Sequence, residues 1–294
     1  MRKQFVKTVE IQLERDERLV LLLGDIGVFG FQKAFKEVPE RVFNIGILEA
    51  ATVSLAAGLA KVNLIPIVHT IAPFLVERAF EQIKIDFGYQ RLGGNFVSVG
   101  ASYDYASLGC THHCPGDVGV LQNIPEMEIV VPGTAAEFDA LFQQTYADGR
   151  PTYYRLSESE NLSSHPVIFG KANVLKKGAL ATVVAVGPTL DYILPAVEGI
   201  DVGVIYYTTI APFDYDTLRA NLAISGKILL VEPFYSGTLA RDVSLATYPK
   251  PVTIDFVGVP REFLTHYGQA NMHDQAIGFT SGKIRARLEE IING

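Results

Sequence analysis

The stretch that decides the fold is Asn44-Ile45-Gly46-Ile47-Leu48-Glu49-Ala50-Ala51. An expected strand ends in it, a glycine allows a tight turn, and an alanine-rich helix follows with a carboxylate in its first turn. A strand that passes through a tight turn into a helix is the repeating step of a βαβ unit. The stretch therefore predicts an α/β fold in which Glu49 lies at a strand-to-helix junction.

The same alternation continues on both sides of this stretch. Short runs of branched apolar residues alternate with helix-length segments, which indicates a mostly parallel sheet covered by helices. The strands that we expect here are Leu19–Leu23, Arg41–Ile45, Ile65–His69, Asn95–Val99, Glu128–Val131 and Thr152–Arg155. The helices that we expect between them are Glu49–Val62, Phe74–Phe87 and Ala135–Ala147.

A polar segment, Ser157–His165, interrupts the pattern and is typical of a linker. A second alternation follows, with expected strands at Ala181–Val186, Val202–Tyr206, Lys227–Val231 and Val252–Phe256 and a C-terminal helix near Asp274–Ile292. We therefore predict two α/β domains, residues 1–165 and 166–294, each a mostly parallel sheet flanked by helices.

Composition narrows the classes of function. A chain of 294 residues with 48% apolar residues can bury a sizeable core, and a formal charge of -7 argues against nucleic-acid binding. No apolar run approaches the roughly 20 residues of a membrane span, and no signal peptide is evident. The two cysteines, Cys110 and Cys114, lie in one loop, which suits a reducing cytoplasm. A mean hydropathy of +0.21 hints at a subunit interface.

Ligands of open parallel sheets bind beyond the carboxyl ends of the strands. That rule marks Gly24–Gly27, Gly46–Glu49, His69-Thr70 and the loop Ala101–Gly116, which we expect at one edge. The sequence allows two interpretations of Glu49. In the first, its charge complements the helix dipole. In the second, the small side chains of its helix leave the carboxyl group desolvated, which suits it to acid–base chemistry.

Two further segments leave alternatives open. Phe74 is either a core residue or a ring that stacks on a flat ligand. The loop Gly109–Gly116 holds Cys110, His112, His113 and Cys114, a density that suggests zinc. Adjacent histidines rarely point at one ion and no second ligand pair lies nearby, so we expect no metal. A histidine that faces the substrate and a purely structural loop both remain possible.

Taken in order, these segments resemble the transketolase superfamily of thiamine-diphosphate enzymes, specifically its pyrimidine-binding domain followed by its C-terminal domain. The residues that carry the resemblance are Gly24-Asp25-Ile26-Gly27, Asn44–Ala50 for the family's N-I-G-I-x-E, Arg78-Ala79-Phe80-Glu81-Gln82-Ile83, Gly109-Cys110-Thr111-His112 for its G-x-T-H, Ile124–Glu137, and Leu230-Val231-Glu232-Pro233 with Ser236-Gly237. The resemblance covers nearly the whole chain.

The resemblance implies a role for Glu49. In the family a glutamate bonded to the aminopyrimidine ring of thiamine diphosphate stabilises the imino tautomer, and Glu49 matches that position. Asp25 and Ile47 fall in matching segments and are expected to contact the cofactor. Phe74 is the expected stacking residue and Ile71 its alternative, because this chain has one extra residue before Arg78.

The resemblance also implies a substrate site. His112 matches the histidine that faces the substrate, where it donates a hydrogen bond or moves a proton. His69 and His113 are further candidates, and Arg155 either contacts substrate or anchors the domain. The stretch Ser102-Tyr103-Asp104 replaces a histidine that contacts phosphate in sugar-phosphate transketolases, so the expected substrate is not the usual phosphorylated ketose.

Family members hold the diphosphate and Mg²⁺ with a G-D-G motif that is followed by an Asn pair, and no segment of this sequence matches that motif. We therefore expect thiamine diphosphate to bind by its pyrimidine half, with Mg²⁺ on an N-terminal transketolase-like partner subunit and with self-association to a dimer or an α2β2 heterotetramer.

The expected function is that of a split transketolase, which moves a two-carbon ketol unit between sugars in carbohydrate metabolism. Three alternatives are kept. The first two are a deoxyxylulose-phosphate synthase-like subunit and the beta subunit of a 2-oxoacid dehydrogenase. The third is a non-catalytic interaction subunit that retains the fold and has no need of a carboxylate at Glu49.

Overall fold

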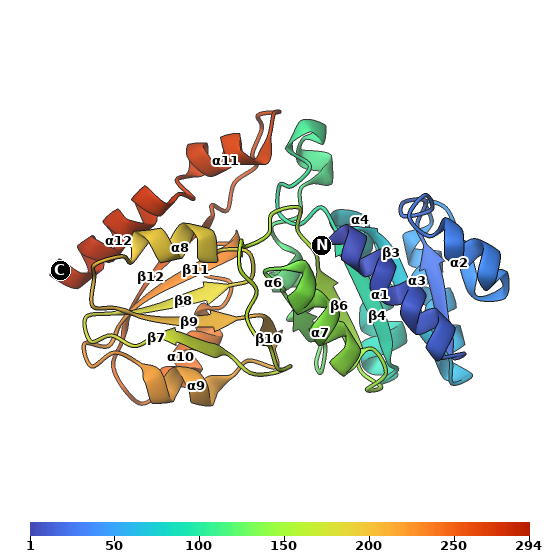
Figure 1. The fold of residues 1–294 in the computed structure, drawn as a ribbon, viewed down its shortest axis with the longest axis horizontal. Helices are drawn as coiled ribbons and strands as arrows, with labels where there is room; N and C mark the ends of the chain where they lie inside the picture. The colour runs from blue at the N-terminus through green and yellow to red at the C-terminus, as the bar shows by residue number, and fades with distance from the viewer.

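The computed structural model describes residues Met1 to Gly294 and contains two sheets that lie side by side (Figure 1). The larger sheet has seven strands in the order β10-β5-β6-β4-β3-β1-β2, and the smaller has five in the order β12-β11-β8-β9-β7. Most pairs are parallel, with β5–β10 and β7–β9 as antiparallel edges. The predicted α/β class with two mostly parallel sheets is confirmed.

The larger sheet contains all six strands that were expected in the first half of the chain. Their bounds are β1 Leu19–Leu23, β2 Val42–Asn44, β3 Ile65–Ile71, β4 Gly94–Val99, β5 Glu128–Val130 and β6 Pro151–Arg155. Every residue of β1, β4 and β6 is buried, as expected for parallel strands with helices on both faces. The apolar runs in the sequence therefore locate these strands to within two residues.

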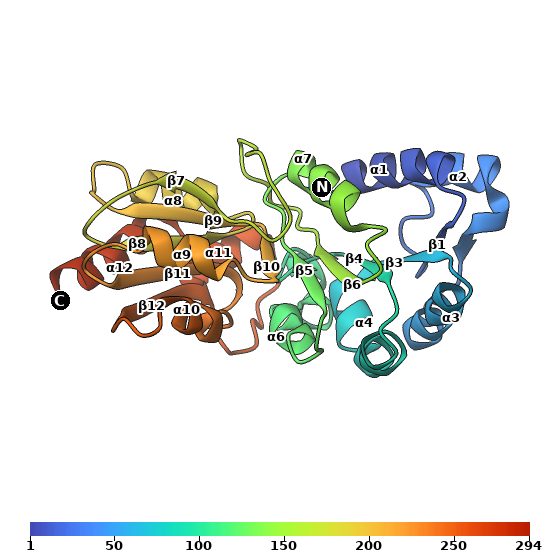
Figure 2. The same ribbon diagram turned by 90° about the horizontal axis from the view of Figure 1, so that it is seen from below.

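Helices cover both faces of the larger sheet (Figure 2). One face carries α1 (Arg2–Arg15), α2 (Gln32–Glu37) and α7 (Ala135–Thr145), and the other carries α3 (Glu49–Lys61), α4 (Ala72–Val76) and α6 (Asp117–Leu121). Because β1, β2, β3 and β4 are parallel neighbours, the loops that follow them lie at one edge. The predicted convergence of these loops is confirmed.

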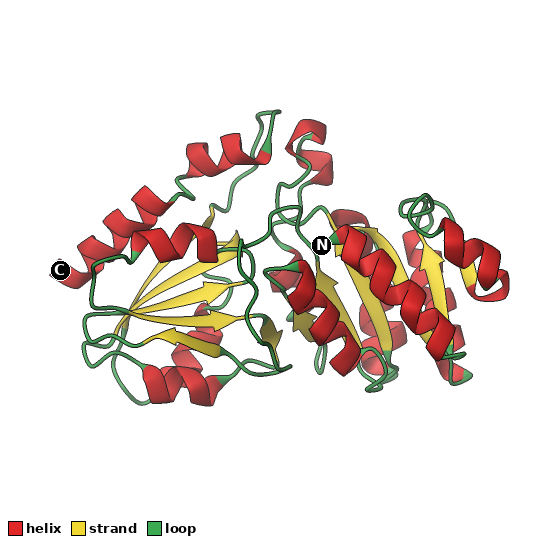
Figure 3. Cartoon of the chain, in the orientation of Figure 1, coloured by secondary structure: helices red, strands yellow, loops and turns green.

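The smaller sheet is built in the same way (Figure 3). Its strands are β7 (Asn173–Lys176), β8 (Thr182–Val186), β9 (Gly203–Tyr207), β11 (Lys227–Tyr235) and β12 (Thr253–Val259). Helices α8 (Leu190–Ala196) and α12 (Ser281–Asn293) cover one face, and α9 (Tyr215–Asn221) and α10 (Ala240–Thr247) cover the other.

The two halves share a strand and a core. Strand β10 (Thr209–Ala211) belongs to the second half by sequence but pairs antiparallel with β5 of the larger sheet. One cluster of buried side chains runs from Val20 of β1 to Ala246 of α10. The polar linker thus connects domains that are packed together rather than loosely tethered.

Two predicted helices are wrong in their continuity. Phe74–Phe87 is divided into α4, a turn at Glu77–Ala79, α5 (Phe80–Gln82) and a π-helix η2 (Ile83–Tyr89). The C-terminal segment is divided into α11 (Ala270–Ile277) and α12, because Gly278 adopts a left-handed conformation with φ 75° that ends α11. The periodicity of apolar residues does not report such breaks.

Candidate functional site

Glu49 is the first residue of α3, and its side chain is only 2% exposed. The N-cap residue Leu48 has no polar side chain, so the carboxylate is the negative group that complements the helix dipole. Its Oε2 accepts a hydrogen bond from Arg78, whereas its Oε1 is buried without a partner. A buried acceptor without a partner is costly, so Oε1 is a place where a ligand donor is expected.

Arg78 joins three parts of the site. Its Nη1 lies 2.9 Å from Oε2 of Glu49, and its Cζ lies 4.3 Å from the ring centroid of Phe74. The Phe74 ring in turn meets the His112 ring edge-on, with centroids 5.2 Å apart. The structure therefore brings Glu49, Phe74 and His112 into one row through Arg78. Sequence reasoning did not assign Arg78 to the site, although it opens a segment that carried the resemblance.

Asn44 fixes the turn that presents Glu49. Its Oδ1 accepts the backbone N–H groups of Asp25 at 3.0 Å and Gly46 at 3.1 Å, and its Nδ2 lies 3.3 Å from Oδ1 of Asp25. Both Asp25 and Gly46 have positive φ, at 66° and 82°. Asn44 thereby ties the loop after β1 to the loop before α3. Asp25, expected to contact the cofactor, lies beside this turn.

The other expected cofactor contacts differ in exposure. Ile47 is 64% exposed in the turn before Glu49 and is free to meet a ligand or a subunit. Ile71 ends β3 and is half-buried, against the positive-φ turn at Gly100. Phe74, in α4, is the one whose ring touches both Arg78 and His112.

The loop that carries His112 is held by the second domain. His112 ends the 3-10 helix η4 (Cys110–His112), and its Nδ1 lies 3.0 Å from Oγ1 of Thr111. At Gly109 φ is 75°, and a Cβ there would lie 2.6 Å from Cε1 of Tyr267. The positive φ and the close approach of the Tyr267 ring both favour glycine at this position.

His113 contacts the second domain. It is buried, and its ring lies 5.5 Å from the ring of His273 in α11. Burial, followed by the charges of His273 and His112, lowers the pKa of His113. The ring therefore belongs to the contact between the two domains.

His69 lies on the opposite face of the sheet. Its ring packs 4.6 Å from that of Phe5 in α1, and its Nδ1 lies 2.9 Å from the carbonyl oxygen of Val97. Burial lowers the pKa of His69 to about 4. Since α1 and α4 cover different faces, the structure does not bring His69 to His112.

Arg155 is 1% exposed and forms an ion pair of 2.8 Å between its Nε and Oδ2 of Asp117. Its Nη2 donates to Oγ of Ser102 at 2.8 Å and to the carbonyl oxygen of Pro233 at 3.2 Å. Pro233 belongs to β11, so Arg155 links the two domains. Of the two interpretations offered by the sequence, this geometry favours the anchor.

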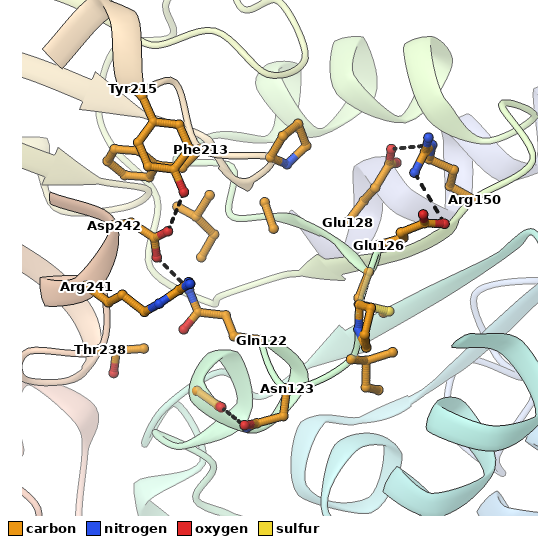
Figure 4. A pocket seen from close by; sticks show the side chains of 17 residues that line it. Gln122, Asn123, Glu126, Glu128, Arg150, Phe213, Tyr215, Thr238, Arg241 and Asp242 are labelled. Carbon is orange, nitrogen blue, oxygen red and sulfur yellow. Dashed lines mark hydrogen bonds and ion pairs between the residues drawn. The ribbon is translucent and has the colours of Figure 1, made fainter. Parts of the chain in front are cut away.

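A large cavity lies away from this row of residues (Figure 4). It encloses about 930 Å³ between the domains, beside the residues that begin β5 and precede β6, Glu128 and Arg150. In it Asp242 accepts hydrogen bonds from Gln122 and Tyr215. Because β5 and β6 begin here, the cavity is at the edge opposite to Glu49. None of the expected site residues lines this cavity, so the cavity does not coincide with the site around Glu49.

The residues present fit the pyrimidine half of thiamine diphosphate. Glu49 offers a buried oxygen without a partner, and Phe74 offers a ring close by. No group of three or more His, Cys, Asp or Glu side chains in the structure is placed to hold a metal ion. None of the helices combines the length and apolar composition that crossing a bilayer requires.

The sequence matches two family descriptions: "Transketolase, pyrimidine binding domain" over residues 1–162 and "Transketolase, C-terminal domain" over residues 170–284. A protein of Rhodococcoides fascians, "Uncharacterized 33.6 kDa protein in fasciation locus", is 40% identical over 98% of this chain and 93% of its own length. One subunit of the apulose-4-phosphate transketolase of Phocaeicola vulgatus is 29% identical over 93% of this chain and 90% of its own length.

Solved structures of transketolases share the fold of this chain. "Split gene transketolase, inactive beta4 tetramer" superposes with a TM-score of 0.84 at 27% identity and covers 99% of this chain and 98% of that one. Transketolase from Leishmania mexicana shares the fold at 16% identity, with a TM-score of 0.84 over 99% of this chain and 45% of that one. The chain belongs to the transketolase family, of which it carries the pyrimidine-binding domain and the C-terminal domain.

Proposed function

We propose that this chain is the C-terminal subunit of a split, thiamine-diphosphate-dependent transketolase that moves a two-carbon ketol unit between sugars. The observation that carries the proposal is the row formed by Glu49, Arg78, Phe74 and His112 at the carboxyl edge of the larger sheet. Two relatives support it, one a subunit of an apulose-4-phosphate transketolase and the other named "6-deoxy-6-sulfo-D-fructose transketolase subunit SqwH", since each aligns over most of its length.

The bound cofactor supplies a nucleophilic carbon that the amino-acid side chains lack. Glu49 holds the pyrimidine ring with a hydrogen bond and moves a proton at its carboxylate oxygen. Phe74 would hold the ring by contact with its face, with Ile71 as the alternative contact. Asp25, in the loop after β1, and Ile47, in the turn before α3, would contact the cofactor from the same edge of the sheet. His112 donates a hydrogen bond to a sugar hydroxyl or carbonyl.

The remaining candidates have lesser roles in this proposal. His69 and Arg155 act as buried structural groups, because each is at most 1% exposed. His113 positions the loop of His112 from its contact with His273. We retain the domain division at residue 165, which agrees with family matches that end at residue 162 and resume at residue 170.

Mg²⁺ and the diphosphate are assigned to an N-terminal partner subunit in an α2β2 assembly, with the cofactor between the subunits. Around the site, Ile47 and Leu48 are 64% and 60% exposed, an apolar surface that such a partner would cover. A cytoplasmic location and a sugar substrate complete the proposal.

Deoxyxylulose-phosphate synthase is the second candidate. The enzyme of Thermus thermophilus is 32% identical over 86% of this chain, but the alignment spans only 42% of that protein. The products distinguish the two candidates: a synthase of this kind would form deoxyxylulose phosphate, whereas a transketolase exchanges two-carbon units between sugars.

The test combines this chain with a purified N-terminal transketolase-like subunit from the same organism, thiamine diphosphate and Mg²⁺. We expect cofactor binding only in the mixture, and two-carbon transfer that Glu49→Gln abolishes. If no such subunit confers cofactor binding and Glu49→Gln has no effect, the chain is a non-catalytic relative.

A further inference from the structure

The Arg78 guanidinium occupies the two surfaces that the proposed function assigns to the pyrimidine ring. Its Nη1 is bonded to the Glu49 carboxylate at 2.9 Å. Its Cζ lies over the face of Phe74, 4.3 Å from the ring centroid. No other side chain of this structure contacts both groups in this way.

A guanidinium and an aminopyrimidine share the features that such a site recognises. Both are planar, both present N–H donors at the edge of the plane, and both can lie against an aromatic face. Glu49 has one free oxygen, Oε1, but the atom is buried below the reach of solvent. The other oxygen, Oε2, is bonded to Arg78, so a ring can bond to Oε2 only if the Arg78 side chain moves.

Arg78 is the side chain that can move. It is 47% exposed and makes no ion pair other than that with Glu49. Its backbone lies in the turn between α4 and α5 rather than in a helix. Breaking the ion pair costs the half-exposed Arg78 guanidinium little free energy, because water can solvate it. The buried Glu49 carboxylate, in contrast, is strongly destabilised without a partner.

We propose that Arg78 is a positioning residue of the cofactor site, which takes the place of the aminopyrimidine in the empty subunit and is displaced from Glu49 when the cofactor binds. The exchange keeps the buried carboxylate paired with a planar N–H donor before and after loading. The inference rests on the proposed function, because the ligand that displaces Arg78 is the cofactor named there.

Two measurements on Arg78→Gln test the exchange, in the complex with the N-terminal subunit. Isothermal titration calorimetry with thiamine diphosphate and Mg²⁺ should give a Kd several-fold lower than wild type, because a competitor for Glu49 is removed. Thermal unfolding should show a lower Tm for the empty complex and an unchanged Tm for the loaded one. Arg78→Lys, which keeps the charge without the planar fork, should give intermediate values.

The matched control is Lys84→Gln. Lys84 also lies over an aromatic ring, at 5.8 Å from the centroid of Phe80, but pairs with no carboxylate. Lys84→Gln should change neither the Kd for the cofactor nor the Tm of the complex. The inference is overturned if Arg78→Gln weakens cofactor binding, or lowers the Tm of empty and loaded complexes equally, because Arg78 would then stay in place. If the wild-type complex binds no cofactor, the proposed function fails with it.

Discussion

Arg78 and Glu49 meet at 2.9 Å although 29 positions separate them in the sequence. The contact exists because β1, β2 and β3 are parallel neighbours, so the turn before α3 and the turn after α4 lie at the same edge. The sequence led us to expect the small side chains of the helix beside Glu49, and the structure adds a cation from another segment that pairs with the carboxylate.

Replacement of Glu49 by Gln tests the assignment of this carboxylate. The amide keeps the shape and the hydrogen-bonding capacity but cannot accept a proton at neutral pH. We expect two-carbon transfer in the reconstituted complex to fall by about 10²- to 10⁴-fold, the usual contribution of acid–base catalysis. The control is Glu81→Gln, at an exposed position of α5. Equal activity of the two variants would remove Glu49 from the chemistry.

Arg155 and Asp117 form a buried pair whose separation should be costly. Asp117→Asn leaves the Arg155 charge buried without a counter-ion, and the loss of one partner in such a pair typically costs about 3–5 kcal/mol. Urea unfolding of the chain should show this decrease in the free energy of unfolding. Asp216 is 88% exposed and pairs with Arg219 at the surface. Asp216→Asn should therefore change the free energy of unfolding by less than about 1 kcal/mol. A similar effect of both variants contradicts the anchor assignment of Arg155.

The strands of the fold were predictable because their signal is local. Every residue of β1, β4 and β6 is buried, and β1 accordingly reads as an uninterrupted apolar run, whereas β4 and β6 combine apolar and aromatic residues with a few buried polar ones. The strand β10 was not predicted, because its three residues form an edge whose pairing with β5 depends on the packing of two domains.

The site was only partly predictable for a similar reason. Glu49 was identified because it begins a helix at the carboxyl edge of the sheet, and Phe74 and His112 because they fall in segments after β3 and β4 that resemble the family's motifs. The ion pair of Glu49 with Arg78 and the burial of His69 depend on tertiary packing. The sequence alone does not determine which face of the sheet the His69 side chain occupies.

Glu232 explains a segment that the sequence marked without a structural reason. Its carboxylate accepts the backbone N–H groups of Gly237, Thr238 and Leu239, the residues that lead into α10. Glu232→Ala leaves these donors unsatisfied and should lower the free energy of unfolding by about 2–4 kcal/mol. Thr134→Ala removes a single N-cap bond of α7 and should cost about 1 kcal/mol. The reverse order in thermal melts would contradict this account.

His69 should make the chain less stable in acid. Burial lowers the pKa of His69 from 6.5 to about 4 in the folded state, so between these values the unfolded chain binds a proton that the folded chain does not. Stability contributed by the neutral ring is therefore complete above about pH 6.5 and is lost as the pH falls to about 4, at a total cost of about 3 kcal/mol. His69→Gln has no titrating ring, so its free energy of unfolding should fall less over that range. The measurement is urea unfolding at a series of pH values, with His266→Gln, at an exposed position, as the control that should follow wild type. Parallel curves for wild type and His69→Gln would show that the ring is protonated within the folded chain and that the face of β3 beneath α1 opens to water.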